Sequence, residues 1–406
     1  IELYNSVELP LVKVLADMEH EGFSVDKAML EVLSGDFAKQ IDALTSEIYR
    51  LSGEEFNINS TRQLGTVLFD KLGLPAMKKT KTGYSTDVEV LEQLYDKHPI
   101  IQKLLEYRQL VKLKSTYVDG LIGIINPETG RIHTRLNQTV TATGRLSSTE
   151  PNLQNIPIRT ENGRQIRKVF VPRSQDYILV DADYSQIELR VLAHISGDKG
   201  LIDTFKRNED IHTRTASEVF GIEIKDVTPL MRGRAKAVNF GIVYGMSDYG
   251  LSQDLKISRK EAKKYIDNYF ARYPGVKQYM TDIVEAARTD GYVKTIMNRR
   301  RYIPEITSRN AVNRNFGERI ALNTPIQGSA ADLIKMAMVK VYDELKKRNL
   351  KSRLILQVHD ELIVETHKSE LSEVKKLVKE CMENAIKLSV PVIADISSGD
   401  SWYNAK

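Results

Sequence analysis

The chain has 406 residues, of which 41% are hydrophobic and 28% are charged, an ordinary globular composition that allows two or three domains with sizeable cores. No apolar run approaches the roughly 20 residues of a membrane span and no signal peptide is apparent, so we expect no membrane association. A net charge of only +5 means that binding to nucleic acid must depend on where the cations lie. The single cysteine, Cys381, excludes a disulfide within the chain and fits a reducing cytoplasm.

Apolar residues at helical spacing predict three helical segments near the start of the chain. Residues 7–21 form a short amphipathic helix, and a longer pattern follows over 26–53, where Asp26 is a suitable N-cap. Thr86 and Glu89 have the spacing of a capping box at the start of a third segment, which a proline interrupts. Two long helices on either side of a basic tip indicate an antiparallel arm.

Further along the chain, helical patterns dominate residues 184–290 and 308–348. Apolar runs typical of strands concentrate in four segments: 131–140, 177–183, 352–366 and 392–396. We find no internal repeat and no low-complexity linker. The pattern is that of a multidomain α+β protein.

The helix expected to begin at Pro229, after the N-cap Thr228, carries an unusual stripe. Its members are spaced four residues apart: Arg232, Lys236, Phe240 and Tyr244. This spacing keeps them on one face for roughly 18 Å, with cations at one end and aromatic rings at the other. The stripe fits the phosphates, sugar and base of a nucleotide, although a solvated basic face that runs into a core aromatic is the alternative.

Acidic residues follow two separate apolar strands. Residues 177–183 form a short buried strand that ends in Asp183, and residues 354–365 form two strands around a tight turn with His359 and Asp360. Two such aspartates satisfy the oxygen-ligand requirement of a two-metal site for phosphoryl transfer, although a structural hairpin is the alternative for the second segment. Cys/His metal spacings and a Gly-rich Walker loop are both missing, which argues against a zinc enzyme and a P-loop ATPase.

Four segments together resemble DNA polymerase family A. The segments DYSQIELR (183–190), RxxxKxxxNFGxxYG (232–245) and QVHDE (357–361) are similar to its motifs A, B and C, and TATGRLSSTEPNLQNIP (141–157) resembles its template-primer motif. The resemblance extends over essentially the whole chain. It implies a right-hand fold in which an antiparallel palm sheet, formed by the four strand segments, lies between a helical thumb and helical fingers.

The resemblance also implies roles for individual residues. The metal ligands of the family fall on Asp183, Asp360 and the backbone carbonyl of Tyr184, and Glu361 is a further catalytic acid of lesser weight. Two Mg²⁺ ions are expected there, with Mn²⁺ as a substitute. Glu188 matches the steric gate that excludes a ribose 2'-hydroxyl, although by itself it reads as an exposed helix acid. The other residues expected to contact the nucleoside triphosphate are Arg232, Lys236, Phe240, Tyr244, His212 and Gln186.

A second group matches positions that contact primer-template DNA in the family: Arg145, Asn152, Gln154, Asn155, Gln327, His359, Arg319 and Asn323. Amide and guanidinium donors in the minor groove can sense base pairing without reading sequence. Basic clusters near the motifs are expected to contact phosphates: Lys78, Lys79 and Lys81; Arg164, Arg167, Lys168 and Arg173; and Arg299, Arg300 and Arg301 in a turn. Asp181 departs from the family signature and is left out of the metal set.

The resemblance implies five segments: palm at 1–25, 126–188 and 346–406, thumb at 26–125, and fingers at 189–345. The expected activity is template-directed DNA synthesis by a cytoplasmic, nucleoid-associated bacterial monomer, with primer-template DNA and deoxynucleoside triphosphates as partners. Single-subunit RNA polymerases share the palm motifs, and a non-catalytic DNA-binding module is a further alternative.

We expect no proofreading by this chain. Asp17-Met-Glu19 and Asp87-Val-Glu89 have the acid spacing of a 3'–5' exonuclease, but both lie in helical patterns without a leading strand. Because the chain begins with Ile1, we also expect it to be a fragment of a longer protein.

Overall fold

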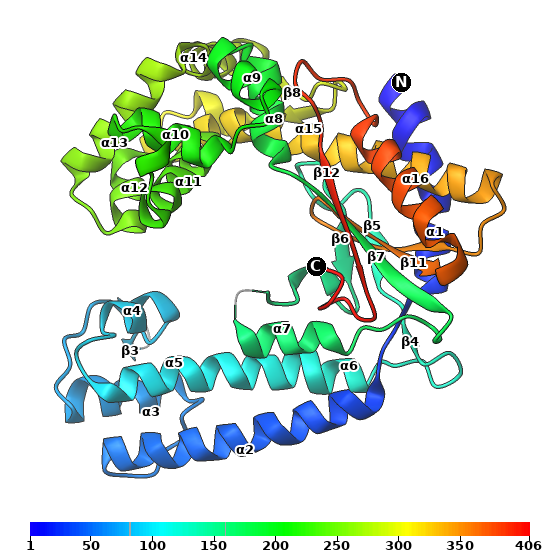
Figure 1. Cartoon of the computed structure of the whole chain (residues 1–406). Helices are drawn as coiled ribbons and strands as arrows, with labels where there is room; N and C mark the ends of the chain where they lie inside the picture. Colours follow the sequence, from blue (N-terminus) through cyan, green and yellow to red (C-terminus); the bar gives the residue numbers. More distant parts are fainter. Residues whose placement is uncertain (81–82, 159) are drawn as a thin grey trace.

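The computed structural model describes residues 1–80, 83–158 and 160–406. A four-stranded antiparallel sheet in the order β10-β11-β7-β12 lies at its centre (Figure 1). Its strands are β7 (Tyr177–Tyr184), β10 (Arg353–Val358), β11 (Glu361–His367) and β12 (Ala394–Gly399). The strands predicted at 177–183 and 352–366 are confirmed, and the last strand begins two residues later than predicted.

The segment 131–140 does not join this sheet, so that part of the predicted palm sheet is wrong. It contains two very short strands, β4 (Arg131–Ile132) and β5 (Arg135–Asn137). They pair with β1 (Phe23–Ser24) and β6 (Ser147–Thr149), respectively. Between them, the Thr134 hydroxyl bonds to the Pro151 carbonyl, which ties the backbone into a local loop. An apolar pattern indicates a strand but does not specify its partner.

A helical arm extends from one side of the sheet (Figure 1). Its long helices α2 (Lys27–Ser52) and α5 (Pro99–Lys112) pack against each other. Asp26 caps α2 as predicted, because its carboxylate accepts the Met29 N–H at 2.9 Å. The smaller elements of the arm are α3 (Thr61–Gly65), η2 (Thr66–Lys71), β2 (Lys79–Thr80), β3 (Gly83–Tyr84), α4 (Val88–Gln93), η3 (Leu113–Asp119) and α6 (Gly120–Ile122).

The predicted capping box at Thr86 is wrong. Helix α4 begins at Val88, and the Asp87 carboxylate accepts the Val90 N–H at 3.0 Å. Thr86 is buried, and its hydroxyl accepts a hydrogen bond from Arg108 instead. Asp and Thr are both good caps, so the sequence spacing alone did not distinguish between them.

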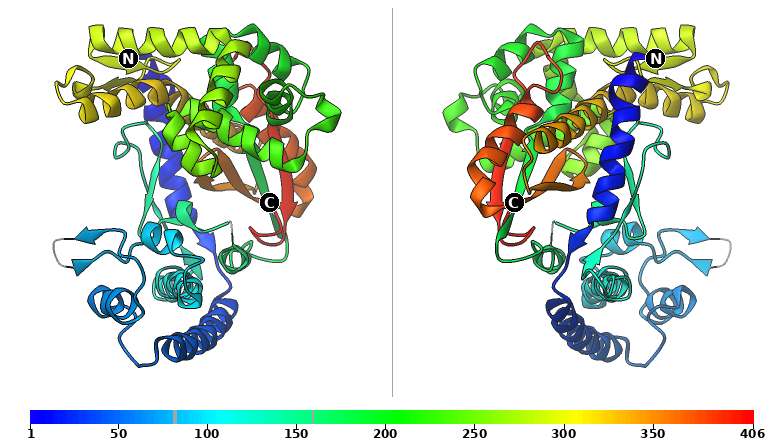
Figure 2. Two further views of the ribbon diagram at one scale, coloured as in Figure 1. Left: turned by 90° about the vertical axis from the view of Figure 1, so that its left-hand side faces the viewer. Right: turned by 90° about the vertical axis from the view of Figure 1, so that its right-hand side faces the viewer.

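A second helical group lies on the other side of the sheet, facing the arm across the molecule (Figures 1 and 2). This helical block contains α8 (Ile187–Ser196), α9 (Lys199–Lys206), α10 (Ile211–Phe220), η5 (Ile224–Asp226), α11 (Pro229–Val243), α12 (Asp248–Leu255), α13 (Arg259–Arg272) and α14 (Pro274–Asp290). A hairpin of β8 (Tyr292–Lys294) and β9 (Arg300–Tyr302) follows, then η6 (Pro304–Thr307) and the long helix α15 (Ala311–Lys347). Arg300 and Arg301 therefore lie in a strand rather than in the predicted turn.

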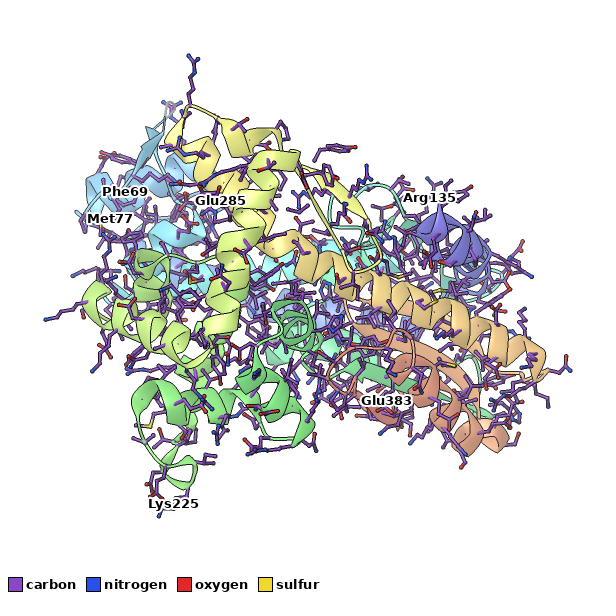
Figure 3. The ribbon with its side chains drawn as sticks, turned by 90° about the horizontal axis from the view of Figure 1, so that it is seen from above. Phe69, Met77, Arg135, Lys225, Glu285 and Glu383 are labelled. Carbon is purple, nitrogen blue, oxygen red and sulfur yellow. The ribbon has the colours of Figure 1, made fainter. Side chains whose placement is uncertain are left out.

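The two faces of the sheet have different neighbours. One face packs into a core shared with α15, with α1 (Leu9–Glu21) and with α16 (Leu371–Glu383), and Figure 3 shows α15 beside α16, which carries Glu383. The other face packs against the base of the arm and α7 (Glu161–Lys168). The remaining elements are η1 (Tyr4–Glu8), η4 (Leu153–Asn155) and η7 (Lys368–Glu370). Within the described residues, none of the helices combines the length and apolarity needed to cross a membrane.

Three arginines from the predicted phosphate-binding clusters pair with acids of the chain itself. The Arg167 side chain is only 6% exposed, and Arg299 pairs with Glu8 and with Asp332, at 2.7 Å. Arg173 donates to Glu365, a fully buried carboxylate that also pairs with Arg131 at 3.2 Å. These guanidinium groups pair with internal acids in this state, and their expected contacts with DNA phosphates stay a prediction.

The Glu365 ion pairs predict a large effect on stability. Glu365→Gln should lower the free energy of unfolding by about 3 kcal/mol, because it leaves two guanidinium groups without their charged partner. Denaturant unfolding of the purified chain measures the change. Glu373→Gln is the control, since its side chain is 48% exposed and pairs with Arg348 at the surface. Equal losses in the two variants would contradict this assignment.

Candidate active site

Asp183 and Asp360 meet at one end of the central sheet. Asp183 lies at the end of β7, and Asp360 lies in the tight turn between β10 and β11, where His359 adopts a left-handed conformation (φ +53°). The Tyr184 N–H donates to the Asp360 carbonyl at 3.1 Å, which holds the turn against the strand. The sequence predicted this meeting of two distant aspartates.

Their carboxylates concentrate negative charge in a partly buried site. Burial raises the pKa of Asp360 to about 7, and the charge of Asp183 adds to the rise. The pKa of Asp183 is raised as well, first by burial and then by Glu361, although Lys406 opposes the rise. The Asp183 side chain remains 40% exposed, so an approaching cation can reach it.

Glu361 and Asp181 lie on the same face of the sheet as Asp183 but deeper. Glu361 is opposite Asp183 in the strand register and is 2% exposed. Its carboxylate accepts hydrogen bonds from Trp402, at 2.8 Å, and from Lys406. Asp181 is 2% exposed and has one carboxylate oxygen without a partner. Burial and the Glu361 charge raise the pKa of Asp181 far above its usual range.

Sequence reasoning missed the roles of Trp402, Lys406 and Arg167 around this site. Arg167 stacks over the Trp402 ring at 4.0 Å and lies 4.0 Å from Glu361. Lys406 Nζ lies 3.5 Å from Asp183. Nothing in the local pattern around these residues indicates that they surround the acids, because the contacts depend on how β12 and α7 pack.

The stripe on α11 has the predicted geometry. Thr228 caps the helix and Pro229 is its first residue. Arg232 pairs with Asp210 at 2.7 Å, whereas Lys236 is exposed, with Nζ 6.0 Å from the Phe240 ring. The Phe240 and Tyr244 rings are stacked at 6.4 Å. The stripe therefore presents two cations and the Phe240 ring along one face of α11, and the Tyr244 ring follows at the C-cap of the helix.

His212 is not exposed beside this stripe. It is 3% exposed, and its Nδ1 lies 3.0 Å from the Asn239 amide. Burial lowers the pKa of His212 to about 4, so the ring is neutral at neutral pH. In this state His212 supports the neighbouring Phe240 ring, 5.9 Å away, and offers no positive charge.

Glu188 is buried, contrary to its reading as an exposed helix acid. It is 8% exposed on the first turn of α8, just after Gln186, which has φ +53°. Its two oxygens accept separate hydrogen bonds, from Arg145 at 2.6 Å and from the Tyr244 hydroxyl at 3.2 Å. The structure therefore joins the template-primer segment, motif A and motif B through one carboxylate.

The residues expected to contact DNA form two groups on different elements of the fold. Beside the first group, a groove of about 640 Å³ separates the arm from the β10–β11 turn. Its lining includes Tyr117, Gln154, Asn155, His359, Asp360 and Lys406. Asn152 caps the short helical turn η4, which contains Gln154 and Asn155. The Gln154 amide donates a hydrogen bond to the Gln357 side chain at 3.1 Å. The second group, Arg319, Asn323 and Gln327, is spaced four residues apart along α15.

Three lysines near the tip of the arm are expected to contact DNA phosphates. Lys78 is exposed and pairs with Asp87 at 3.3 Å, and Lys79 belongs to β2. Lys81 lies outside the described residues. In Figure 3, Phe69 and Met77 mark this end of the arm.

Among the residues that the structure describes, no group of three or more His, Cys, Asp or Glu side chains is arranged to hold a metal ion. The carboxylates of Asp183 and Asp360, with the nearby backbone of Tyr184, are the oxygen donors that suit a hard divalent cation. Burial and the nearby Asp183 charge raise the pKa of Asp360, and a bound cation would favour the charged form of this carboxylate.

The family model of DNA polymerase family A matches residues 27–404. The chain belongs to DNA polymerase family A. This family A chain is 56% identical over 404 residues to DNA polymerase I of Caldicellulosiruptor bescii and of Geobacillus stearothermophilus, covering 100% of the chain but 47% and 46% of those proteins. It is 55% identical over 406 residues to DNA polymerase I of Bacillus subtilis. The chain thus spans about half the length of these relatives.

Solved structures agree with the family. One, described as the POL domain of Pol1 from M. smegmatis in complex with DNA primer-template and dNTP, superposes with a TM-score of 0.94. The identity is 51%, and the match covers 100% of this chain and 71% of the other. The predicted family and the α+β polymerase fold class are therefore confirmed for this family A chain.

Proposed function

We propose that this chain catalyses template-directed DNA synthesis, adding deoxynucleotides to a primer 3'-hydroxyl with release of pyrophosphate. The observation that carries the proposal is the meeting of Asp183 and Asp360 at the end of the sheet, in a chain of family A. The solved relative that binds primer-template and dNTP supports the choice of partners. We propose that the chain acts as a monomer, in the cytoplasm of a bacterium.

We propose that the central sheet is the palm, the arm (26–125) the thumb and the helical block the fingers. The palm would consist of residues 1–25, 126–188 and 346–406, and the fingers of 189–345. Helix α15 continues past the proposed boundary at 345. It contacts α14 and the β8 strand on the fingers side and α1 and α16 on the palm side. This continuous helix would connect movement of the fingers to the palm.

Asp183, Asp360 and the Tyr184 carbonyl would hold two Mg²⁺ ions, for which Mn²⁺ could substitute. Mg²⁺ commonly takes only one or two carboxylates from a protein, because phosphates and water supply its other ligands. When bound, the ions would favour ionisation of the primer hydroxyl and stabilise negative charge on the phosphates. Glu361 would help to set the charge around Asp183 through its contacts with Lys406 and Trp402.

The α11 stripe would hold the triphosphate and the base. The exposed Lys236 would make a point contact with a phosphate, and Arg232 would exchange Asp210 for a phosphate oxygen. The Phe240 ring would pack on the sugar, and Tyr244 would leave its present position when the fingers close. We also assign Gln186 and His212 to this nucleotide site, with His212 acting through its support of Phe240.

Glu188 would exclude ribonucleotides by filling the space of a 2'-hydroxyl. Arg145, Asn152, Gln154, Asn155 and His359 on one side, and Arg319, Asn323 and Gln327 on the other, would contact the primer-template. Lys78, Lys79 and Lys81 would contact backbone phosphates of the duplex at the tip of the thumb.

Primer extension tests the proposal. A labelled primer on a DNA template should grow with Mg²⁺ and deoxynucleotides and should not grow with ribonucleotides or with chelator. Growth with ribonucleotides would instead favour an RNA polymerase. Lack of growth with either, together with retained DNA binding in a gel-shift assay, would leave a non-catalytic binding module. Shortening of the labelled primer without nucleotides would contradict the expected absence of proofreading.

A further inference from the structure

Lys406 places a positive charge beside the acids of the candidate active site. Its ammonium group lies 3.5 Å from the Asp183 carboxylate and donates a hydrogen bond to Glu361. Glu361 has 3% side-chain exposure and Lys406 33%, so the bond to Glu361 lies at the buried edge of the groove. Asp183 therefore has a cationic partner from the chain itself, at the place where a divalent cation would bind.

The segment before Lys406 is packed into the protein, which fixes the direction of this side chain. Trp402 is fully buried, its backbone N–H donates to the Phe170 carbonyl at 2.9 Å, and its ring contacts Phe23. The Ala405 carbonyl accepts a hydrogen bond from the Ser397 hydroxyl of β12. Figure 1 shows this end of the chain beside α7 and the sheet. The ammonium is therefore held next to the acids by a folded segment.

We propose that Lys406 is a positioning residue that acts as an internal counter-cation and competes with divalent cations for Asp183. The inference rests on the proposed function, because it takes Asp183 and Asp360 as the metal site. A cation bound to Asp183 would repel an ammonium group 3.5 Å away, so the side chain must withdraw toward solvent when the ion binds. The free protein would then bind the ion more weakly than the bare carboxylates would.

A purely structural role for Lys406 predicts a different result. If the lysine only fastens Glu361, its removal lowers stability and leaves metal affinity unchanged. If it competes for Asp183, removal of its charge raises metal affinity as well. Metal affinity in the absence of DNA and nucleotide therefore separates the two roles.

The test compares Lys406→Met, which removes the charge, with Lys406→Arg, which keeps it. Binding of Mn²⁺ to the purified full chain is measured by electron paramagnetic resonance of the free ion. We expect Lys406→Met to bind Mn²⁺ about fivefold to tenfold more tightly than the unaltered chain. This change is at the low end of the range for two coupled binding sites, because the lysine is partly exposed to solvent. Lys406→Arg should stay within about twofold of the unaltered chain. Lys376→Met, with an exposed lysine on α16, is the control.

Thermal unfolding supplies the second readout. With chelator, Lys406→Met should unfold at a lower temperature than the unaltered chain. Saturating Mn²⁺ should raise the unfolding temperature of Lys406→Met by more than it raises that of the unaltered chain. An unchanged Mn²⁺ affinity in Lys406→Met would overturn the proposal about Lys406 and leave the proposed function intact. If Asp360→Ala binds Mn²⁺ as well as the unaltered chain does, or if no protein binds it, the metal assignment of the proposed function fails and the proposal fails with it.

Discussion

Asp360→Ala should reduce primer extension by at least about a thousandfold, because it removes one of the two carboxylates at the proposed metal site. DNA binding should persist, since the change removes negative charge from the groove. Single-turnover extension with saturating primer-template and Mg²⁺ measures the chemical step, and fluorescence anisotropy of the labelled duplex measures binding.

Two further variants separate loss of the ligand from damage to the turn. Asp360→Asn keeps the size and the turn-forming side chain and should be nearly as inactive as Asp360→Ala, because an amide is a poor substitute for a carboxylate ligand. Asp176→Ala, at the exposed segment before the other end of β7, should retain normal extension. Near-normal extension by Asp360→Ala would show that Asp360 is not a metal ligand.

Glu188→Ala should reduce discrimination against ribonucleotides by about a hundredfold, because the space that excludes a 2'-hydroxyl would be opened. Extension with deoxynucleotides should also fall several-fold, since Arg145 and Tyr244 would lose their shared carboxylate partner. The measurement is incorporation of a single nucleotide, first with the deoxynucleotide and then with the corresponding ribonucleotide. The ratio of kcat/KM for the two substrates gives the discrimination.

Glu188→Gln and Tyr244→Phe show which property of Glu188 matters. If exclusion is steric, Glu188→Gln should keep most of the discrimination, because the amide has nearly the same size. Tyr244→Phe removes the 3.2 Å hydrogen bond and leaves Glu188 in place, so discrimination should change little. An unchanged ratio in Glu188→Ala would sink the steric-gate assignment.

The sequence alone predicted most of the elements whose signals are local, although it indicated Thr86 where Asp87 caps α4. The Asp26 cap, the helix start at Thr228–Pro229 and the strand that ends near Asp183 each follow from a few neighbouring residues and match the structure. The hairpin turn at His359–Asp360 was equally clear, because two apolar strands leave only these residues between them. The motifs also indicated the family, which the comparisons confirm.

Strand pairing could not be predicted in the same way. The segment 131–140 has the composition of a strand, but its residues pair with β1 and β6 and stay outside the central sheet. The partner of a strand is set by packing between distant segments, and a local apolar pattern contains no information about it.

The electrostatic surroundings of the site also depended on the tertiary structure. Helical periodicity predicted that Glu188 is a surface acid. Because Arg167, Arg173 and Arg299 belong to basic clusters near the motifs, they were expected to contact phosphates. Folding buries Glu188 between Arg145 and Tyr244, and it commits the three arginines to internal acids or to the Trp402 ring.

The sequence by itself determined the family, the helices with local caps and the identity of the acids that end the strands. Only the tertiary structure decided which charges neutralise one another: Lys406 lies 3.5 Å from Asp183 although 223 positions separate them in the numbering (406 − 183). The physical reason is that a cap or a turn is stabilised by neighbours in the chain, whereas the partner of a buried charge is whichever group packing brings to it.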